Sequence, residues 1–134
     1  MIELVFVIVI LGILAAVALP KLSATREDAI IAKGRSDVAS IRSAIINERQ
    51  TRIIKGQTNW ISKLEPDNTT DLFINVLMYP HKDQDKSGHW HKKDNNGKYY
   101  YKIGSTKCNF TYDNTDGTFE LDANQNSICD QLVK

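Results

Sequence analysis

The first acidic residue, Glu3, precedes an unbroken apolar run that extends from Leu4 to Leu19 and stops at Pro20. An ionisable side chain in lipid costs roughly 2.5–3.5 kcal/mol at the bilayer centre and less near an interface. Such a residue usually has a partner, and no Lys or Arg precedes Lys21. The remaining cation is an α-amino group, either this chain's own or that of another copy. The spacing therefore predicts that Glu3 pairs with an amine during assembly.

Two polar segments have the oxygen-rich spacing of a calcium-binding loop. They contain Asp83, Asp85, Ser87 and Asp94 in the first, and Asp122, Asn124 and Asn126 in the second. The first has Asp where a bidentate Glu is normal, and Lys86 adds positive charge. A solvated polar loop is the preferred interpretation, with calcium as the alternative and no other cofactor indicated.

Nothing in the sequence is typical of an enzyme or a nucleic-acid binder. No nucleophile–base pattern, P-loop or dinucleotide motif appears, and the net charge of +1 lacks the basic excess of most nucleic-acid-binding domains. The histidines at 81, 89 and 91 are interpreted as exposed residues beside a buried Trp90, with a transition-metal site as the weaker alternative. We therefore expect no enzymatic activity and no specific nucleic-acid partner.

Cys108 and Cys129 are the two cysteines of the chain. If the apolar segment sends the polar region across a membrane, that region meets an oxidising compartment, where disulfides form. A bridge would close a loop of about 20 residues and stabilise the fold by roughly 3 kcal/mol. We predict this disulfide, against the alternative of two reduced, buried thiols.

One long helix is predicted over residues 2–54, with Gly56 as its C-terminal stop. The apolar segment continues past Pro20, with a kink permitted there, into an amphipathic segment from Ser23 onward. The apolar stripe of that segment has heptad-like spacing and consists of Ile31, Gly34, Val38, Ile41 and Ile45. No domain built from the remaining residues could cover a helix roughly 80 Å long. Its first half must therefore lie in lipid or against other chains.

The remaining residues predict a small head. We expect a loop over 57–66, a short helix over 72–77 that ends before Pro80, and a long surface loop over 81–98 anchored by Trp90. Three antiparallel strands are expected over 99–103, 106–112 and 118–121, with turns at 104–105 and 113–117. The fold class is α+β, with a long helix packed on a meander. Its organisation is 1–22 apolar helix, 23–56 amphipathic helix and 57–134 head.

The N-terminal sequence MIELVFVIVILGILAAVALPKL resembles that of type IV pilins and the related pseudopilins of type II secretion. The resemblance is close over about the first 25 residues and loose over the rest. It depends on the acid before a long aliphatic run, on Gly12, and on the Ala-x-x-x-Leu-Pro ending at Pro20. In that family a peptidase removes a basic leader and the new first residue is methylated. By that pattern Met1 lies two positions late, so we expect either that two residues and a leader are missing before it, or that maturation differs here and moves the amine relative to Glu3.

The resemblance implies a filament subunit that waits in the bacterial inner membrane and is then assembled into an extracellular pilus. It implies three partners: further copies in a helical homopolymer, an inner-membrane assembly platform and a prepilin peptidase. The assembly residues it implies are Met1, Glu3, Gly12 and Pro20, with Glu3 neutralising a neighbour's amine. The stretch from Gly12 to Pro20 is expected to unwind in the filament.

Three functions follow from these observations, in order of preference. The first is a major-type pilin, whose role in adhesion, motility or DNA uptake the sequence does not distinguish. The second is a pseudopilin that forms a short periplasmic filament for protein secretion. The third is a monomeric binding module for which the helix is only an anchor, and it ranks last because an anchor needs no acid at Glu3.

Overall fold

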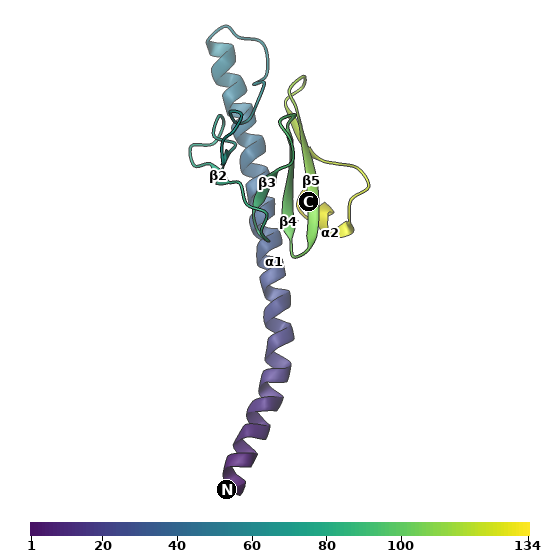
Figure 1. Ribbon diagram of the computed structural model, residues 1–134. Coiled ribbons are helices and arrows are strands. Elements are labelled where there is room, and N and C mark those ends of the chain that lie inside the picture. Colours follow the sequence, from purple (N-terminus) through teal and green to yellow (C-terminus); the bar gives the residue numbers. More distant parts are fainter.

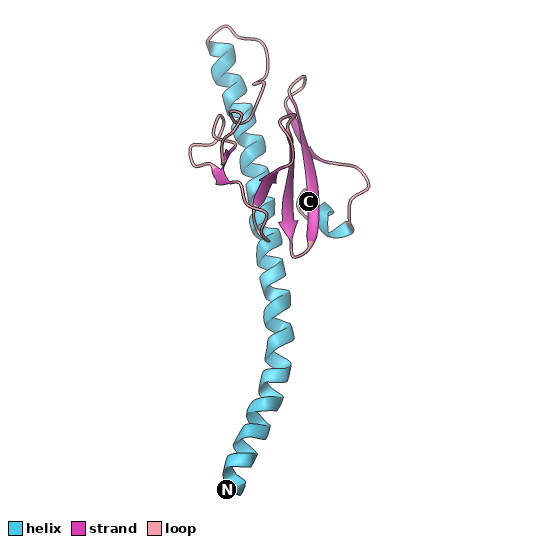
Figure 2. Cartoon of the chain, in the orientation of Figure 1, coloured by secondary structure: helices cyan, strands magenta, loops and turns pink.

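The computed structural model describes residues 1–134 and shows one long helix with a small head packed along its C-terminal half (Figure 1). The elements are α1 (Ile2–Ile54), β1 (Asp71–Leu72), β2 (His81–Lys82), β3 (Trp90–Lys92), β4 (Lys98–Ile103), β5 (Thr106–Asp113), β6 (Thr118–Leu121) and α2 (Ser127–Asp130). The predicted α+β class is confirmed. The strands lie beside the upper half of α1 only, and the lower half is bare (Figure 2).

Helix α1 is continuous for 53 residues and includes Pro20. Proline removes one helical N–H donor and crowds the preceding turn, yet the lower half of the helix bends gently without a break (Figure 1). Lys55 caps the C-terminus, and Gly56 follows with φ +79°. Glycine adopts that left-handed conformation without steric cost. The predicted bounds and stop of the helix are confirmed.

The predicted heptad stripe is the face of α1 that the head covers. The buried residues of the helix are Ile31, Gly34, Val38, Ile41 and Ile45. Gly34 allows the closest approach, since a Cβ there would lie 2.5 Å from Tyr101 Cε1 and 2.7 Å from Leu132 Cδ2. The heptad spacing therefore identified the contact between helix and head from sequence alone.

The main sheet is antiparallel with the strand order β3-β4-β5-β6, and β1 and β2 form a separate two-stranded sheet. The turn between β4 and β5 consists of Gly104 and Ser105, with Ile103 paired to Thr106. Gly104 has φ +59° and Ser105 is not in the left-handed region. This pattern agrees with the predicted type II′ turn. The three predicted strands of the meander are confirmed as β4, β5 and β6.

Two predictions for the head were wrong. The segment 81–98 is not one surface loop, because it contains β2 and β3, and Trp90 of β3 pairs with Tyr101 of β4. No helix forms over 72–77. Leu72 instead pairs with His81, and Phe73 has φ +63°, outside the helical region. Burial of both Leu72 and Phe73 at 0% exposure outweighs the local helix signal.

An aromatic core joins the sheet to α1. It consists of Phe73, Trp90, Tyr99, Tyr101, Phe110 and Phe119, each at most 2% exposed. Phe110 and Phe119 stack with ring centroids 5.3 Å apart. The polar ends of the tyrosines find partners, as buried hydroxyls must: Tyr101 donates to the Ile30 carbonyl at 2.9 Å. The head is therefore held to α1 both by apolar packing and by directed hydrogen bonds.

Candidate functional site

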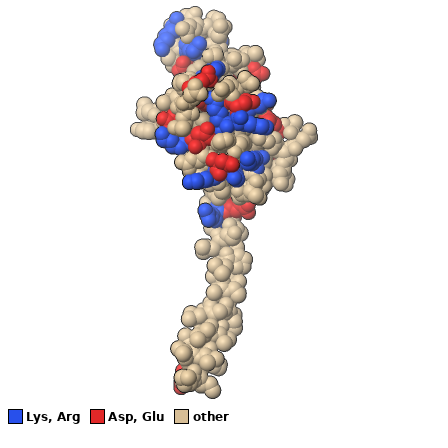
Figure 3. Space-filling model, in the orientation of Figure 1, with Lys and Arg blue, Asp and Glu red and all other residues tan.

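The N-terminal half of α1 has no partner within the chain. All residues from 1 to 29 are exposed, and the run from Leu4 to Leu19 is apolar apart from Gly12. In Figure 3 this shaft carries almost no charged atoms, whereas the head above it is densely covered with both signs. The helix is long and apolar enough to cross a membrane, and none of its apolar window is buried in the chain. By length and composition it could therefore anchor the protein in a membrane.

Glu3 lies at the lower end of this shaft, in the first turn of the helix. Its Oε2 is 3.3 Å from the α-amino nitrogen of Met1, and both groups are exposed. An exposed pair contributes little in water, but its strength rises as water is excluded. The geometry leaves the Glu3 carboxylate accessible to a second chain.

Gly12 and Pro20 are both helical in this single chain. A Cβ at Gly12 would meet no atom within 4 Å, so no contact inside the chain requires a glycine there. Pro20 lies in the bare part of the helix and is exposed. The expected unwinding between the two residues concerns the assembled filament and stays a prediction.

A second stripe on α1, which the sequence reasoning missed, lies opposite the head. It repeats with the same heptad spacing and consists of Thr25, Ala29, Ala32, Ser36, Ala39, Ser43, Ile46, Gln50 and Ile53. All nine residues are exposed and none is charged. We call this set the back face of α1. The signal was visible in the sequence as a second repeat, offset by about half a turn from the buried one.

Charged side chains of the upper helix lie on its flanks and point to the head. Arg42 Nε donates to the Phe119 carbonyl at 2.9 Å, and Arg35 Nε donates to the Gln131 carbonyl at 2.9 Å. Lys33 Nζ donates to the Gly88 carbonyl at 2.6 Å. These bonds stabilise the head on the helix, and they leave the back face uncharged along its whole length.

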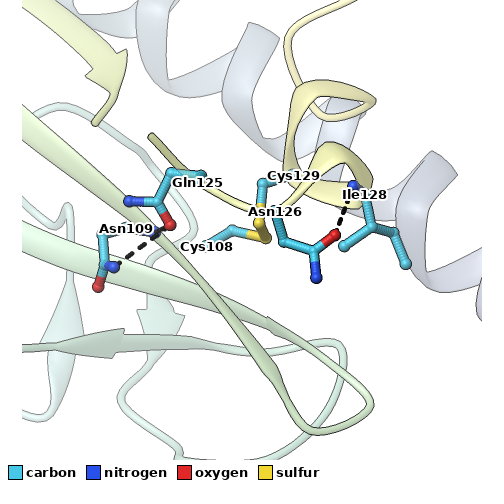
Figure 4. Close-up of a disulfide and its surroundings, with 6 residues drawn as sticks. All are labelled: Cys108, Asn109, Gln125, Asn126, Ile128 and Cys129. Atoms are coloured by element: carbon cyan, nitrogen blue, oxygen red, sulfur yellow. Dashed lines mark hydrogen bonds between the residues drawn. A yellow bond between two sulfur atoms is a disulfide. The ribbon is translucent and has the colours of Figure 1, made fainter. Parts of the chain in front are cut away.

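The predicted disulfide between Cys108 and Cys129 is present, with a Cα–Cα distance of 5.4 Å (Figure 4). It joins β5 to the short helix α2, and both cysteines are fully buried. The Asn126 side chain caps α2 by accepting from the Ile128 N–H at 3.2 Å. The bridge therefore closes the C-terminal tail against the sheet, as expected.

The side chains of the first calcium-loop candidate do not point to a common site. Asp83 faces His91, Asp85 pairs with Lys102 at 2.9 Å, and Asp94 accepts from the backbone N–H of Asn96 at 2.9 Å. The hydrogen bond from Lys102 holds the pKa of Asp85 below its ordinary value. The Ser87 hydroxyl accepts from the Gly104 N–H at 2.8 Å. Each side chain of the set thus has a partner in the protein.

The side chains of the second calcium-loop candidate also have separate surroundings. Asp122 accepts from the Thr111 hydroxyl at 2.6 Å, Asn126 is the cap of α2, and Asn124 adopts φ +60° in an exposed turn. Across the chain, no three His, Cys, Asp or Glu side chains are grouped as metal ligands. The oxygen spacing in these two segments is accounted for by turns, caps and ion pairs.

The histidines do not lie together. His81 Nε2 is 3.9 Å from Asp37 of α1, and His91 packs against Tyr100 with ring centroids 4.8 Å apart. Burial lowers the pKa of His81, although Asp37 acts in the opposite direction. Trp90, between His89 and His91, is fully buried and donates from Nε1 to Asp37 at 3.2 Å. Of the three histidines, His81 thus lies beside α1, whereas His91 packs within the head.

Comparison of the chain with protein-family models, curated proteins and solved structures finds no match.

Proposed function

We propose that this chain is a structural subunit, a major-type pilin that polymerises through α1 into an extracellular filament. The observation that carries the proposal is the exposed helical segment of residues 1–29, whose apolar run from Leu4 to Leu19 is preceded by the acid Glu3. Before assembly this segment lies in the bacterial inner membrane. In the filament the same segment packs against the helices of other copies, and the heads form the outer surface. An assembly platform and a prepilin peptidase are the partners that this route requires.

The back face of α1 supports polymerisation over simple anchoring. A membrane anchor needs about 20 apolar residues, and the apolar run already ends at Leu19. The back face extends the uncharged surface from Thr25 to Ile53, far beyond that need. Small residues such as Ala32, Ser36 and Ala39 let two helices approach closely. A neighbouring helix is the surface that fits such a stripe.

In this proposal Glu3 supplies an attraction between helices that apolar packing does not provide. Helices gain no hydrophobic free energy by leaving lipid for one another, since both environments are apolar. In a water-poor environment the electrostatic attraction between a cation and a carboxylate that has no other counter-charge is strong. The amino terminus of a neighbouring copy is that cation in our proposal. The pairing fixes the axial position of one helix relative to the next.

The test replaces Glu3 with Gln, which keeps the size of the side chain and removes its charge. We expect normal accumulation in the membrane and a filament yield lowered by at least about tenfold, the equivalent of 1.4 kcal/mol in assembly. Glu27→Gln is the matched control, because Glu27 is an exposed acid higher on the same helix. Filament yield, measured by electron microscopy and shearing, that is equal in the two variants would contradict the proposal.

The runner-up is a pseudopilin, since the N-terminal resemblance covers both groups. It predicts a short periplasmic filament, no surface fibre and a head whose folding depends on calcium. A membrane-anchored binding module is the third candidate. It predicts that an unrelated transmembrane helix can replace residues 1–22 without loss of function.

A further inference from the structure

A polar cavity of about 350 Å³ lies in the head, away from the helix surface proposed for assembly. Its walls come from the loop after α1, the connection between β3 and β4, and the ends of β4 and β5. The lining residues that matter for ligand binding are Glu65, Lys92, Asn95, Asn96, Tyr99 and Asn114. Its volume lies within the range of roughly 300–1,000 Å³ common for small-ligand sites.

The floor of the cavity is a buried charge pair. Glu65 is 2% exposed and is the one buried charged residue of the chain. It accepts from the Tyr99 hydroxyl at 2.8 Å and from the Phe73 N–H at 3.2 Å, and Lys92 Nζ lies 3.0 Å away. The carboxylate is therefore fully supplied with donors.

The ammonium of Lys92, in contrast, has fewer acceptors in the protein than it has donors. An ammonium carries three N–H donors, and Glu65 Oε1 is the one acceptor that the protein places beside it. The Lys92 side chain is only 11% exposed. Donors of Lys92 are consequently available to a hydrogen-bond acceptor that enters the cavity.

The rim carries amides without partners in the chain. The side-chain amides of Asn95, Asn96 and Asn114 form no hydrogen bond within the protein, whereas the nearby Asp113 is used by Thr115 in a turn. Each amide can both donate and accept. In the lining, two basic residues, Lys63 and Lys92, balance two acidic residues, Glu65 and Asp113. The site therefore favours a ligand without net charge.

We propose that this cavity binds a neutral, hydroxyl-rich ligand, specifically one sugar unit of a glycan. Sugar hydroxyls both donate and accept, and they match free amides and a lysine better than an ion or an apolar molecule would. The proposal does not depend on filament assembly, because the cavity is formed by one chain.

The experiment uses the full chain, labelled with ¹⁵N, in detergent micelles. The probes are glucose, galactose, mannose, N-acetylglucosamine and N-acetylgalactosamine. At least one should shift the amide signals of Asn96, Gly97 and Asn114 saturably, with a Kd on the order of 1 mM, as expected for a ligand of this size. Glucuronic acid and glucosamine, which are charged, should bind more weakly than that sugar.

Asn95→Ala and Asn114→Ala should each weaken that binding by about fivefold, equivalent to the loss of roughly one hydrogen bond. Asn47→Ala is the matched control, because Asn47 is exposed on α1 outside the cavity. If none of the five neutral sugars gives a saturable shift, or if the shifts lie outside the cavity, the proposal is wrong. Equal affinity in all three variants would also overturn it.

Discussion

At the scale of single residues, two acids have opposite surroundings. Glu3 is exposed at the start of the bare helix, and Glu65 is buried within the head. The first is available to another chain, whereas the second is saturated by donors from its own chain. Glu3 could be singled out from the sequence because nothing else in the apolar run is charged. It gave no sign of Glu65, whose role depends on contacts with Tyr99 and Lys92 that are distant in sequence.

Replacement of Glu65 with Gln should destabilise the head. The change leaves the ammonium of Lys92 buried without its counter-charge, and breaking a buried ion pair costs about 3–5 kcal/mol. Urea unfolding of the full chain in micelles measures the loss. Glu120→Gln, at an exposed acid of β6, should change the free energy of unfolding by less than about 0.5 kcal/mol. Equal stability of the two variants would show that the buried pair contributes nothing.

The buried tyrosines predict a loss of stability at high pH. Burial raises the pKa of Tyr112 to about 12, and burial also raises the pKa values of Tyr99 and Tyr101 above their ordinary value. The unfolded chain therefore releases these protons first, so the stability they contribute is complete below pH 10 and falls as the pH rises above it. Ultraviolet absorbance of tyrosinate should rise together with loss of the folded signal. Titration of all tyrosines near pH 10 in a folded protein would contradict this.

At the scale of elements, Gly34 is the tightest point between α1 and the sheet. A Cβ there would lie within 3 Å of both Tyr101 and Leu132. Gly34→Ala should therefore destabilise the head by about 1–3 kcal/mol, the usual cost of overpacking. Gly12→Ala is the control, since its Cβ would meet nothing. If thermal unfolding shows Gly34→Ala to be as stable as the wild type, the packing described for this face is wrong.

Helix α1 was predictable and the connection between it and the sheet was not. Heptad spacing located the buried stripe because the positions of Ile31, Val38 and Ile45 follow a repeat that can be read from the local sequence. The segment 72–77 has helix-like spacing, but its conformation is decided by burial of Phe73 and by the pairing of Leu72 with His81. Such pairing is non-local, so a local pattern cannot reveal it. Strand β3 was missed for the same reason.

The features of the candidate site also divide into those that the local sequence reveals and those that depend on the fold. Glu3, the disulfide and the apolar shaft could be found by residue type and order along the chain. The polar cavity could not, because its walls come from three separated segments that only the fold brings together. In the two segments with calcium-like spacing, the polar side chains serve as helix caps and ion-pair partners.

At the scale of the whole molecule, charge is segregated between the head and one side of the helix. The head carries mixed charges and the apolar shaft carries almost none (Figure 3). The nine residues of the back face are uncharged. A molecule with one extended uncharged side is suited to repeated lateral packing.

Insertion of a charge into the back face should block filaments without unfolding the head. Ala39→Glu adds a carboxylate at an exposed helical position, so the free energy of unfolding should change by less than about 0.5 kcal/mol. Ala123→Glu, on an exposed turn of the head, is the control and should assemble normally. Sheared-filament yield is the measurement. Filaments from Ala39→Glu at the control's level would exclude the back face from assembly.

The most direct test of the central claim is cryo-electron microscopy of the fibre formed by the chain. We predict a helical filament whose core consists of packed α1 helices with residues 1–29 at its centre, whose surface consists of the heads, and in which Glu3 lies within hydrogen-bond distance of a neighbour's α-amino group. A chain that forms no fibre, or a fibre in which the apolar half of α1 is not at the core, would contradict it.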